Sequence, residues 1–345
     1  MASLHSLDDK LLICASSKIF LASRLQEALL AVGTSSKTVL ILDSKTLQLR
    51  RGFRIPKAPT SITFDQDNSH IIVGDRAGNV CRYTVDASEN SGYVDMNGED
   101  SPYEGEPLSS AITMVLDVAV SEDGRFLLAA DRDEKIRVSR YPQAYVVQSF
   151  CLGHSAYVSS VAVYKNRVFS SGGDSIVHEW NIENGGSIAH SEKLCDDPVR
   201  RLCILPKEVQ DLFYVVVIAG SRLIVLDDKL QLIKNIEVSS EIMDITVQEG
   251  NVVGVSSAGV FLCNATDGAV KTLVIPKELS EALSTAKDPI SNYFKNVTHQ
   301  NMVDYYKRKA EKIETMRENK NRKRKAKEQR RKAAKRLATE EKLAC

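Results

Sequence analysis

A tight turn between two short strands recurs along the first three quarters of this chain, and it limits the possible folds more than any other feature. The pattern is clearest in "SGGDSIVHEWN", where Asp174 at the turn is followed six residues later by Trp180. Five other segments fit the same frame, with turn residues at Ser36, Ala77, Asp133, Gly220 and Ser257. Successive turns are 41, 56, 41, 46 and 37 residues apart. A strand-built repeat of about 40–45 residues is typical of a WD-type β-propeller.

We therefore predict an all-β fold for residues 1–285, a seven-bladed WD40-type β-propeller. Six blades follow from the six hairpins, and "LLICASSKIFLAS" (11–23) supplies strands for the seventh. We expect strands from the two ends of this domain to complete one shared blade and so close the ring. The 56-residue interval contains residues 86–110, which include seven acids and no Lys or Arg. This composition predicts a flexible acidic loop between two blades.

The full WD signature occurs in only one repeat. Its members are His154, Ser170, Asp174 and Trp180. In such blades these side chains form a hydrogen-bonded chain that ties the strands together. A functional alternative would make His154 and Asp174 a catalytic pair, but a buried structural network explains the same residues better. Because the other repeats lack the signature, we expect strand packing to hold the remaining blades together.

The net charge of +1 conceals a basic C-terminal segment. Residues 303–345 contain 17 Lys and Arg against 7 Asp and Glu, whereas residues 1–302 carry a net charge of −9. No Gly or Pro follows Pro289 and good helix formers dominate, so residues 286–345 are predicted to form a basic α-helical tail. We assign nucleic-acid contact and nuclear import to ten basic residues: Arg322, Lys323, Arg324, Lys325, Lys327, Arg330, Arg331, Lys332, Lys335 and Arg336. A solvated helix without a partner is the simpler alternative.

The sequence lacks the motifs that the common classes of enzyme use. No glycine-rich turn leads from a strand into a helix, and no G-x-S-x-G elbow, H-E-x-x-H or P-loop occurs. The seven cysteines are scattered without a C-x-x-C pair, which argues against a zinc site and favours reduced thiols in the nucleus or cytosol. No apolar run is long enough to span a membrane. We therefore expect a binding platform with no catalytic residue, no metal and no membrane contact.

The most charged strand of the chain lies in "ADRDEKIRVSRYP" (130–142), which has seven charged residues among thirteen. In a propeller these residues occupy one rim, where charges are accessible to a partner. The surrounding stretch 116–142, with "QSFCLGH" (148–154) and "YVSS" (157–160), closely resembles the non-catalytic WD-repeat subunits of tRNA (guanine-N7)-methyltransferases. "FKNVT" and "YYKRKAEK" in the C-terminal part are similar to the end of the same family.

This resemblance implies a function in tRNA methylation. In the family, the propeller docks side-on against a separate Rossmann-type chain that binds S-adenosylmethionine. The pair methylates N7 of a guanosine in the tRNA variable loop, usually position 46, and the propeller keeps the catalytic chain active and helps the complex engage tRNA. The resemblance thus implies a heterodimer in the nucleus, and in the cytoplasm as well. The cofactor belongs to the partner chain only, and the basic tail contacts tRNA.

Carried onto this sequence, the resemblance implies a docking surface centred on one blade rim. The residues that we assign to it are Arg132, Asp133, Lys135 and Arg137, together with the neighbouring loop 153–160, which includes Tyr157 and Ser160. Relatives often carry a basic residue at the position of Ser160, and we expect Lys165 or Arg167 to replace that contact here. Two other functions stay open. One is a WD scaffold in another nuclear RNA-processing assembly, such as ribosome maturation; the other is a propeller hydrolase with ligands from several blades.

Overall fold

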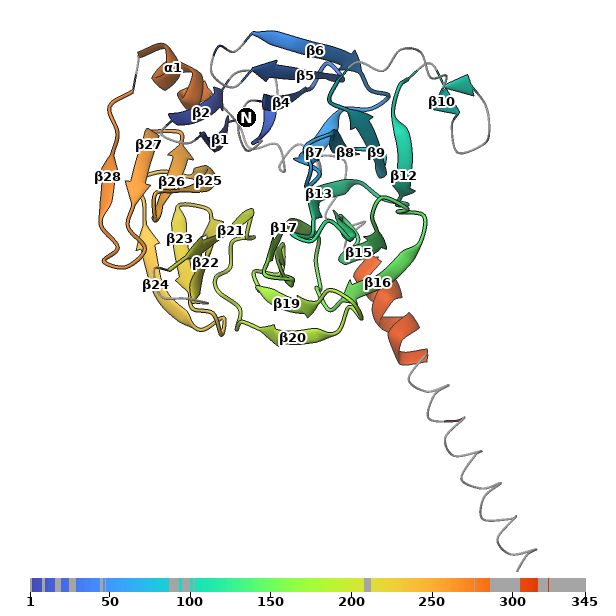
Figure 1. Cartoon of the computed structure of the whole chain (residues 1–345). Helices are drawn as coiled ribbons and strands as arrows, with labels where there is room; N and C mark the ends of the chain where they lie inside the picture. The colour runs from blue at the N-terminus through green and yellow to red at the C-terminus, as the bar shows by residue number, and fades with distance from the viewer. Residues whose placement is uncertain are drawn as a thin grey trace, which may run out of the picture. The chain divides into compact units, whose positions relative to one another are not determined.

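The computed structural model divides into two units, residues 1–288 and 289–345, which we treat separately. The described residues are 2–7, 10–15, 20–24, 29–43, 46, 48–86, 93–94, 100–101, 103–207, 212–275, 277–285, 305–315 and 322. The first unit is an all-β propeller (Figure 1). Its described strands include six four-stranded antiparallel sheets around a central axis, which we number as blades 1 to 6 in chain order.

Each blade runs from an inner strand beside the axis to an outer strand at the perimeter (Figure 1). Blade 1 comprises β3 (Phe20–Arg24), β4 (Leu29–Thr34), β5 (Thr38–Asp43) and β6 (Leu49–Arg54). Blade 2 comprises β7 (Pro59–Phe64), β8 (His70–Asp75), β9 (Asn79–Thr84) and β12 (Glu106–Ser110). Blade 3 comprises β13 (Val115–Val120), β14 (Phe126–Asp131), β15 (Lys135–Arg140) and β16 (Val147–Leu152).

The other three blades follow the same inner-to-outer order. Blade 4 comprises β17 (Val158–Tyr164), β18 (Arg167–Gly172), β19 (His178–Asn181) and β20 (Ser187–His190). Blade 5 comprises β21 (Arg201–Pro206), β22 (Phe213–Ala219), β23 (Arg222–Leu226) and β24 (Leu232–Glu237). Blade 6 comprises β25 (Ile242–Gln248), β26 (Asn251–Ser256), β27 (Gly259–Cys263) and β28 (Val270–Thr272).

The prediction of seven blades is wrong, because the described strands form six four-stranded blades. Strand β1 (Ala2–Leu7) pairs with β2 (Lys10–Ala15) in a separate two-stranded sheet. The segment 11–23 is therefore divided between this hairpin and blade 1, because residues 11–15 pair with the strand before them. The expected shared blade is also absent among the described strands, since each four-stranded sheet uses strands from one stretch of chain. The ring closes instead through β1, which contacts both β25 and β3 (Figure 1).

The acidic segment 86–110 is only partly a loop. Its last residues form β12, which pairs with β9 and completes blade 2. Glu106 accepts hydrogen bonds from Arg82 Nε at 3.0 Å and Nη2 at 2.6 Å, and Arg51 pairs with Glu104. Strands β10 (Tyr93–Val94) and β11 (Asp100–Ser101) pair with each other, and much of the remaining segment lies outside the described residues. Composition alone missed β12 because Arg82 of the neighbouring strand β9 balances its one acid, Glu106.

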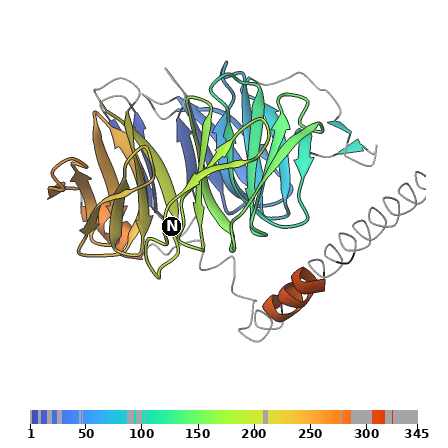
Figure 2. The same ribbon diagram turned by 90° about the horizontal axis from the view of Figure 1, so that it is seen from below.

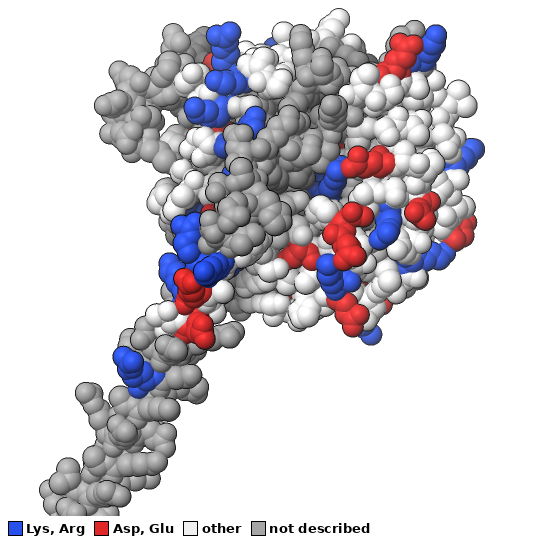
Figure 3. Space-filling model, turned by 180° about the vertical axis from the view of Figure 1, so that it is seen from behind, with Lys and Arg blue, Asp and Glu red and all other residues white. Residues whose placement is uncertain are grey.

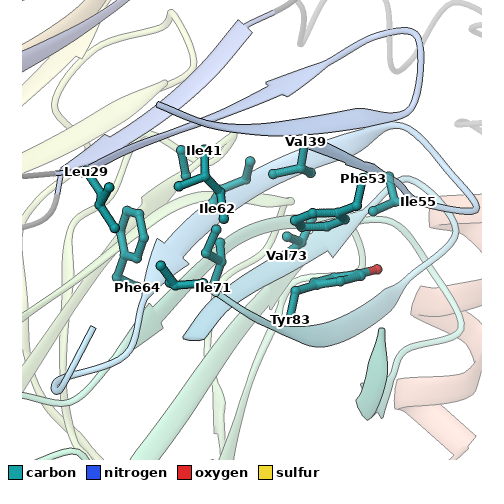
Figure 4. Packing of buried hydrophobic residues seen from close by; sticks show 12 residues of the cluster. Leu29, Val39, Ile41, Phe53, Ile55, Ile62, Phe64, Ile71, Val73 and Tyr83 are labelled. Atoms are coloured by element: carbon teal, nitrogen blue, oxygen red, sulfur yellow. The ribbon is translucent and has the colours of Figure 1, made fainter. Parts of the chain in front are cut away.

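Apolar cores lie between neighbouring blades. Figure 4 shows one of them, in which Val39 and Phe53 of blade 1 pack against Ile62, Val73 and Tyr83 of blade 2. The Phe53 and Tyr83 rings stack with their centroids 4.6 Å apart. The second strand of this blade, β8, is buried on both faces, which explains its nearly continuous apolar run "HIIVGD". Each blade is therefore held by its neighbours as well as by its own strand pairing.

A polar belt also joins the blades around the axis. It consists of one equivalent position in five inner strands, occupied by Ser61, Asp117, Ser160, Arg201 and Asp244. In four of these strands the register shifts next to that position, as at a β-bulge. Arg201 of blade 5 donates from Nε to Asp244 Oδ1 of blade 6 at 3.0 Å. The expectation that packing holds the blades outside the WD repeat is therefore incomplete.

The helices are short in the described part of the chain. Helix α1 (Lys277–Thr285) follows blade 6 in the first unit, and its Leu283 side chain is buried against Val253, Val255 and Val260. In the second unit, residues 305–315 form a helix with mostly exposed side chains. Among the described helices, none is long and apolar enough to cross a membrane.

Candidate docking site and the WD network

The turns of the propeller gather at two opposite rims, because neighbouring strands are antiparallel (Figure 2). The first rim contains the turns between the second and third strands of each blade, such as 132–134, and the loops that enter each inner strand, such as 111–114. The Arg132 N–H donates to the Met114 carbonyl at 3.0 Å and joins these two segments. The second rim contains the turns between the first and second strands, such as 165–166.

The charged turn of blade 3 lies at the first rim and is organised by Asp131. The Asp131 carboxylate accepts N–H bonds from Asp133 at 2.8 Å and from Lys135 at 3.2 Å, and burial raises its pKa. Glu134 has a φ of 70°, the left-handed conformation of a tight turn. Lys135 Nζ lies 4.0 Å from Asp131 Oδ2, and the lysine side chain is 45% exposed. Asp131 therefore builds the turn, whereas Arg132, Asp133 and Lys135 are partly exposed on it.

Arg137 spans the junction between blades 2 and 3. Its Nε donates to Ser139 Oγ at 3.0 Å, and its two terminal nitrogens lie 3.4 Å from the Ser110 carbonyl oxygen and 3.3 Å from that of Ala144. These partners are all neutral. Burial lowers the pKa of the Arg137 guanidinium, which shows that its charge is partly removed from water. A carboxylate from a partner chain would compensate this charge better than these neutral groups do.

A groove of about 220 Å³ lies beside these two cations, between the edge of blade 2 and the outer part of blade 3. Lys135, Arg137, Ile112 and Phe150 all line it. Ile112 is 98% exposed and Phe150 is 45% exposed. Leu152, which pairs with Lys135 across the sheet, is 63% exposed. We call Ile112, Lys135, Arg137, Phe150 and Leu152 the blade 3 docking patch.

Sequence reasoning found the cations of this patch and missed its apolar side chains. One sequence signal was available in "SFCLG", where Phe150 and Leu152 alternate with Cys151, which is fully buried. That alternation in an outer strand places two large apolar residues on its solvent side. Ile112 gave no such signal, because it lies in a loop between blades.

The WD network forms one continuous chain of hydrogen bonds in blade 4. Trp180 Nε1 donates to Ser170 Oγ at 2.8 Å, Ser170 Oγ lies 2.8 Å from His154 Nε2, and His154 Nδ1 lies 2.8 Å from Asp174 Oδ2. Because the indole can only donate, the simplest proton arrangement has Ser170 donating to His154 and His154 donating to Asp174. The His154 and Asp174 side chains are 1% and 4% exposed. This burial supports the structural interpretation over the catalytic pair.

The charges in this network are set by burial and hydrogen bonds. Burial alone would raise the pKa of Asp174, but the hydrogen bond from His154 and the backbone N–H groups of Ser155 and Ile176 lower it overall. In the neighbouring His178, burial lowers the pKa to about 4. His154, Asp174 and His178 could each offer one atom to a metal ion. Such an ion would displace the bond between His154 and Asp174, so the geometry favours a structural role.

Lys165 and Arg167 lie at the second rim, so they do not join Arg132, Asp133 and Lys135 on one surface. The Lys165 N–H donates to Glu122 Oε1 at 2.9 Å within that rim. Arg167 donates to both carboxylate oxygens of Glu179, at 2.6 and 2.9 Å, and to the Asp228 carbonyl of blade 5 at 3.0 Å. Its role in the structure is to clamp blade 4 to blade 5. We expected Lys165 or Arg167 to replace a contact on the docking surface. The structure corrects this expectation, because both residues lie at the rim opposite Lys135.

Ser160 was also expected on the docking surface, but the structure places it in the interior. It is 1% exposed, and its hydroxyl accepts the Leu202 N–H of blade 5 at 3.2 Å. This residue belongs to the polar belt and not to an accessible surface. Tyr157 does lie at the first rim, where its carbonyl accepts the Gly173 N–H at 2.9 Å. Of the ten basic tail residues, only Arg322 is described, as an exposed helical residue, and the other nine lie outside the described residues.

Comparison with known proteins identifies the family to which this propeller is similar. Residues 89–266 match a family model described as the tRNA methyltransferase TRM82 WD40 domain. The tRNA (guanine-N(7)-)-methyltransferase non-catalytic subunit of Caenorhabditis elegans is 33% identical over 336 residues, which cover 92% of this chain and 81% of that protein. The human subunit WDR4 is 32% identical over 158 residues, which cover 45% of this chain and 35% of that protein.

A solved structure supports the fold. The WD40 β-propeller domain of Doa1 matches with a TM-score of 0.61 at 13% sequence identity, over 76% of this chain and 84% of that one. At this identity the match concerns the propeller fold alone. The family model and the nearly full-length relative go further: the chain belongs to the family of tRNA (guanine-N7)-methyltransferase non-catalytic subunits.

Proposed function

We propose that this propeller binds a separate catalytic methyltransferase chain through the blade 3 docking patch and holds it in an active shape. The observation that carries the proposal is the exposure of Ile112 and Leu152 beside Lys135 at the first rim. Protein interfaces draw most of their affinity from a few apolar anchors, while charges orient the partner. The relatives' names, which specify a non-catalytic subunit, support a catalytic chain as that partner.

The chemistry of methyl transfer is assigned to the partner. A Rossmann-type methyltransferase holds its cofactor at a turn from a strand into a helix, where backbone N–H groups face the ligand. The described turns within the six blades lead from strand to strand. We therefore assign the cofactor and the N7-methylation of a tRNA guanosine to the catalytic chain, with position 46 of the variable loop as the target. This chain contributes a rigid platform and needs neither cofactor nor metal for that role.

The basic tail is proposed to contact tRNA. Residues 303–345 carry a net charge of +10, and ten basic residues cluster between 322 and 336. Contacts between cationic side chains and phosphates position an RNA without reading its bases, so specificity would come from tRNA shape and the partner's pocket. The same cluster fits a nuclear import signal, and we propose the nucleus as the main compartment, with the cytoplasm as a second one.

A tagged purification tests this function. The full chain should co-purify a methyltransferase, and the pair should form N7-methylguanosine in tRNA at a rate that the catalytic chain alone does not reach. Deletion of residues 317–345 should weaken tRNA binding and flatten its salt dependence while the pair stays intact. Purification of an RNA-processing assembly without a methyltransferase would favour the alternative scaffold function. Methyl transfer by the isolated chain would contradict the proposal.

A further inference from the structure

A second charged surface lies on the first rim, over blades 1 and 2, and it contains only cations. Its exposed residues are Lys37, Arg54, Lys57 and Arg76. We call these four residues the blade 1–2 cationic patch. Lys37 lies in the turn between β4 and β5, and Arg76 lies in the turn between β8 and β9. Arg54 is the last residue of β6, and Lys57 lies in the loop after it. The patch therefore combines three segments of the chain that the propeller fold brings together.

Backbone hydrogen bonds fix these segments side by side. Arg54 pairs with Thr38 across the sheet, next to Lys37, and the Lys37 carbonyl accepts the Ile55 N–H at 2.9 Å. Lys57 follows in the same loop, where the Ala58 carbonyl accepts the Arg76 N–H at 3.1 Å. Residues paired across antiparallel strands have Cα atoms about 4.5–5.5 Å apart. The four charges are therefore crowded along a short part of the rim.

Acidic residues do not balance this patch in the way that they balance other arginines of blade 1. Within the described residues, Lys37, Arg54 and Lys57 form no ion pair. The nearest acid in the sequence, Asp75, is 6% exposed, and its carboxylate accepts the N–H groups of the turn that follows it. Like charges in one place repel each other, so Lys37, Arg54 and Lys57, which have no ion-pair partner among the described residues, favour binding of a polyanion.

Other charged regions of the propeller are different. Arg50 and Arg51 on the outer strand of blade 1 pair with Asp86 and Glu104. Figure 3 shows one face of the propeller, on which Lys and Arg side chains lie next to Asp or Glu over much of the surface. The cationic patch therefore stands apart from the charge pattern of the rest of the molecule, whose residues 1–302 carry a net charge of −9.

We infer that the blade 1–2 cationic patch binds the phosphate backbone of tRNA. The inference rests on the proposed function, and it adds a second RNA-binding surface to the tail. RNA fits this patch better than a protein does, because none of the exposed large apolar residues that the structure describes lies in the three segments that carry these cations. The neighbouring Ser35 is exposed and offers a hydroxyl donor, which phosphate contacts commonly use. The docking patch on the same rim offers apolar anchors instead.

The two surfaces lie in order along one rim, with loop 111–114 between blades 2 and 3. A catalytic chain on the blade 3 docking patch would therefore leave the rim of blades 1 and 2 open to the RNA that the partner holds. Nucleic-acid interfaces are more positively charged than protein interfaces, which matches the difference between the two patches.

The test uses the full chain in its complex with the catalytic subunit. The triple variant Lys37→Ala, Arg54→Ala and Lys57→Ala removes three cations, and the matched control removes the exposed Arg140, Lys229 and Lys271 from other parts of the propeller. The patch variant should weaken tRNA binding by about tenfold or more. The slope of log K against log salt should become shallower by about two to three, since each lost phosphate contact contributes about 0.7–0.9. The control should change neither quantity.

The outcomes separate this inference from the proposed function. An unchanged salt slope in the patch variant, with a complex that still forms and methylates tRNA, would overturn the inference and leave the proposed function intact. Loss of the catalytic subunit from the patch variant, with the fold preserved by circular dichroism, would identify the patch as a protein interface and also overturn it. Failure of the wild-type chain to bind any methyltransferase would reject the proposed function itself.

Discussion

The Ser61 hydroxyl donates a 2.7 Å hydrogen bond to the Asp117 carboxylate across the boundary between blades 2 and 3, although the residues are 56 positions apart in the sequence. The same carboxylate accepts the Val118 N–H at 3.1 Å and, from blade 4, the Val161 N–H at 2.9 Å. One side chain therefore connects three consecutive blades. Asp117 is 5% exposed, so its charge is compensated only when the ring is assembled.

Removal of this carboxylate should destabilise the ring. Asp117→Ala leaves the Ser61 hydroxyl and the Val161 N–H without their partner, and we expect the free energy of unfolding to fall by about 2–3 kcal/mol. Urea denaturation followed by circular dichroism measures the change. Asp196→Ala is the control, because that carboxylate is fully exposed. A result for Asp117→Ala within about 0.5 kcal/mol of the control would show that the belt does not hold the blades together.

His178 should make the stability of the propeller depend on pH. Its ring stacks on Trp180 with centroids 5.0 Å apart, and its ring nitrogens have no hydrogen-bond partner in the described structure. Burial lowers its pKa from 6.5 to about 4. The unfolded chain thus binds the proton at higher pH than the folded chain does. Stability should be highest above about pH 6.5 and fall as the pH decreases towards 4.

The variant His178→Phe isolates this effect, because phenylalanine keeps the aromatic stack and cannot titrate. As the pH falls, the free energy of unfolding of the wild-type protein should decrease by about 1.4 kcal/mol for each tenfold difference in proton affinity between the unfolded and the folded state. The variant should not show this decrease, because its residue 178 binds no proton. Urea denaturation at several pH values between about 7 and 4.5 provides the comparison. Parallel pH profiles for the two proteins would exclude His178 as the source.

The propeller fold could be predicted because each hairpin leaves a local mark in the sequence. Asp131 and Asp174, for example, precede turns in which their carboxylates accept the following N–H groups. The number of blades could not be read in the same way. It depends on the strand with which residues 11–15 pair: they pair with residues 2–6 and give a hairpin instead of a full blade. That choice is made by packing between blades 6 and 1, which no local pattern records.

The sequence predicted the exposed position of Lys135 correctly, but it did not locate the other assigned residues equally well. Lys135 lies in a charged strand that the sequence shows directly. Ser160 is different, because its burial follows from a hydrogen bond to Leu202, 42 residues away. Lys165 and Arg167 were grouped with residues of the opposite rim because the end at which a turn lies depends on strand direction in the assembled sheet. Long-range contacts and strand direction therefore limit what a single sequence can locate.

Arg167 should contribute to stability without affecting the docking of the catalytic chain. Arg167→Ala removes the bidentate pair with Glu179 and the contact with the Asp228 carbonyl, and it leaves a carboxylate that is 5% exposed without its cation. We expect the free energy of unfolding to fall by about 2–3 kcal/mol. Co-purification of the catalytic chain should stay unchanged. If the variant is still folded at the assay temperature but no longer binds the catalytic chain, Arg167 would have to be assigned to the docking surface.

The blade 3 docking patch should depend on its apolar anchor as much as on its cations. Ile112→Glu places a charge where an exposed apolar side chain would be buried by the partner, and we expect the affinity for the catalytic chain to fall by at least about tenfold. Lys135→Glu combined with Arg137→Glu should abolish co-purification, with circular dichroism as a check because Arg137 also contacts neutral groups between two blades. Both effects can be measured by pull-down and by titration calorimetry.

Leu232→Glu is the matched control for Ile112→Glu, because Leu232 is 59% exposed on the outer strand of blade 5, away from the patch. It should leave the affinity for the catalytic chain unchanged. Equal losses in the two variants would mean that added negative charge weakens binding wherever it is placed. An unchanged affinity for Ile112→Glu would show that the groove between blades 2 and 3 is not covered in the complex, and the catalytic chain would then have to bind another part of the propeller.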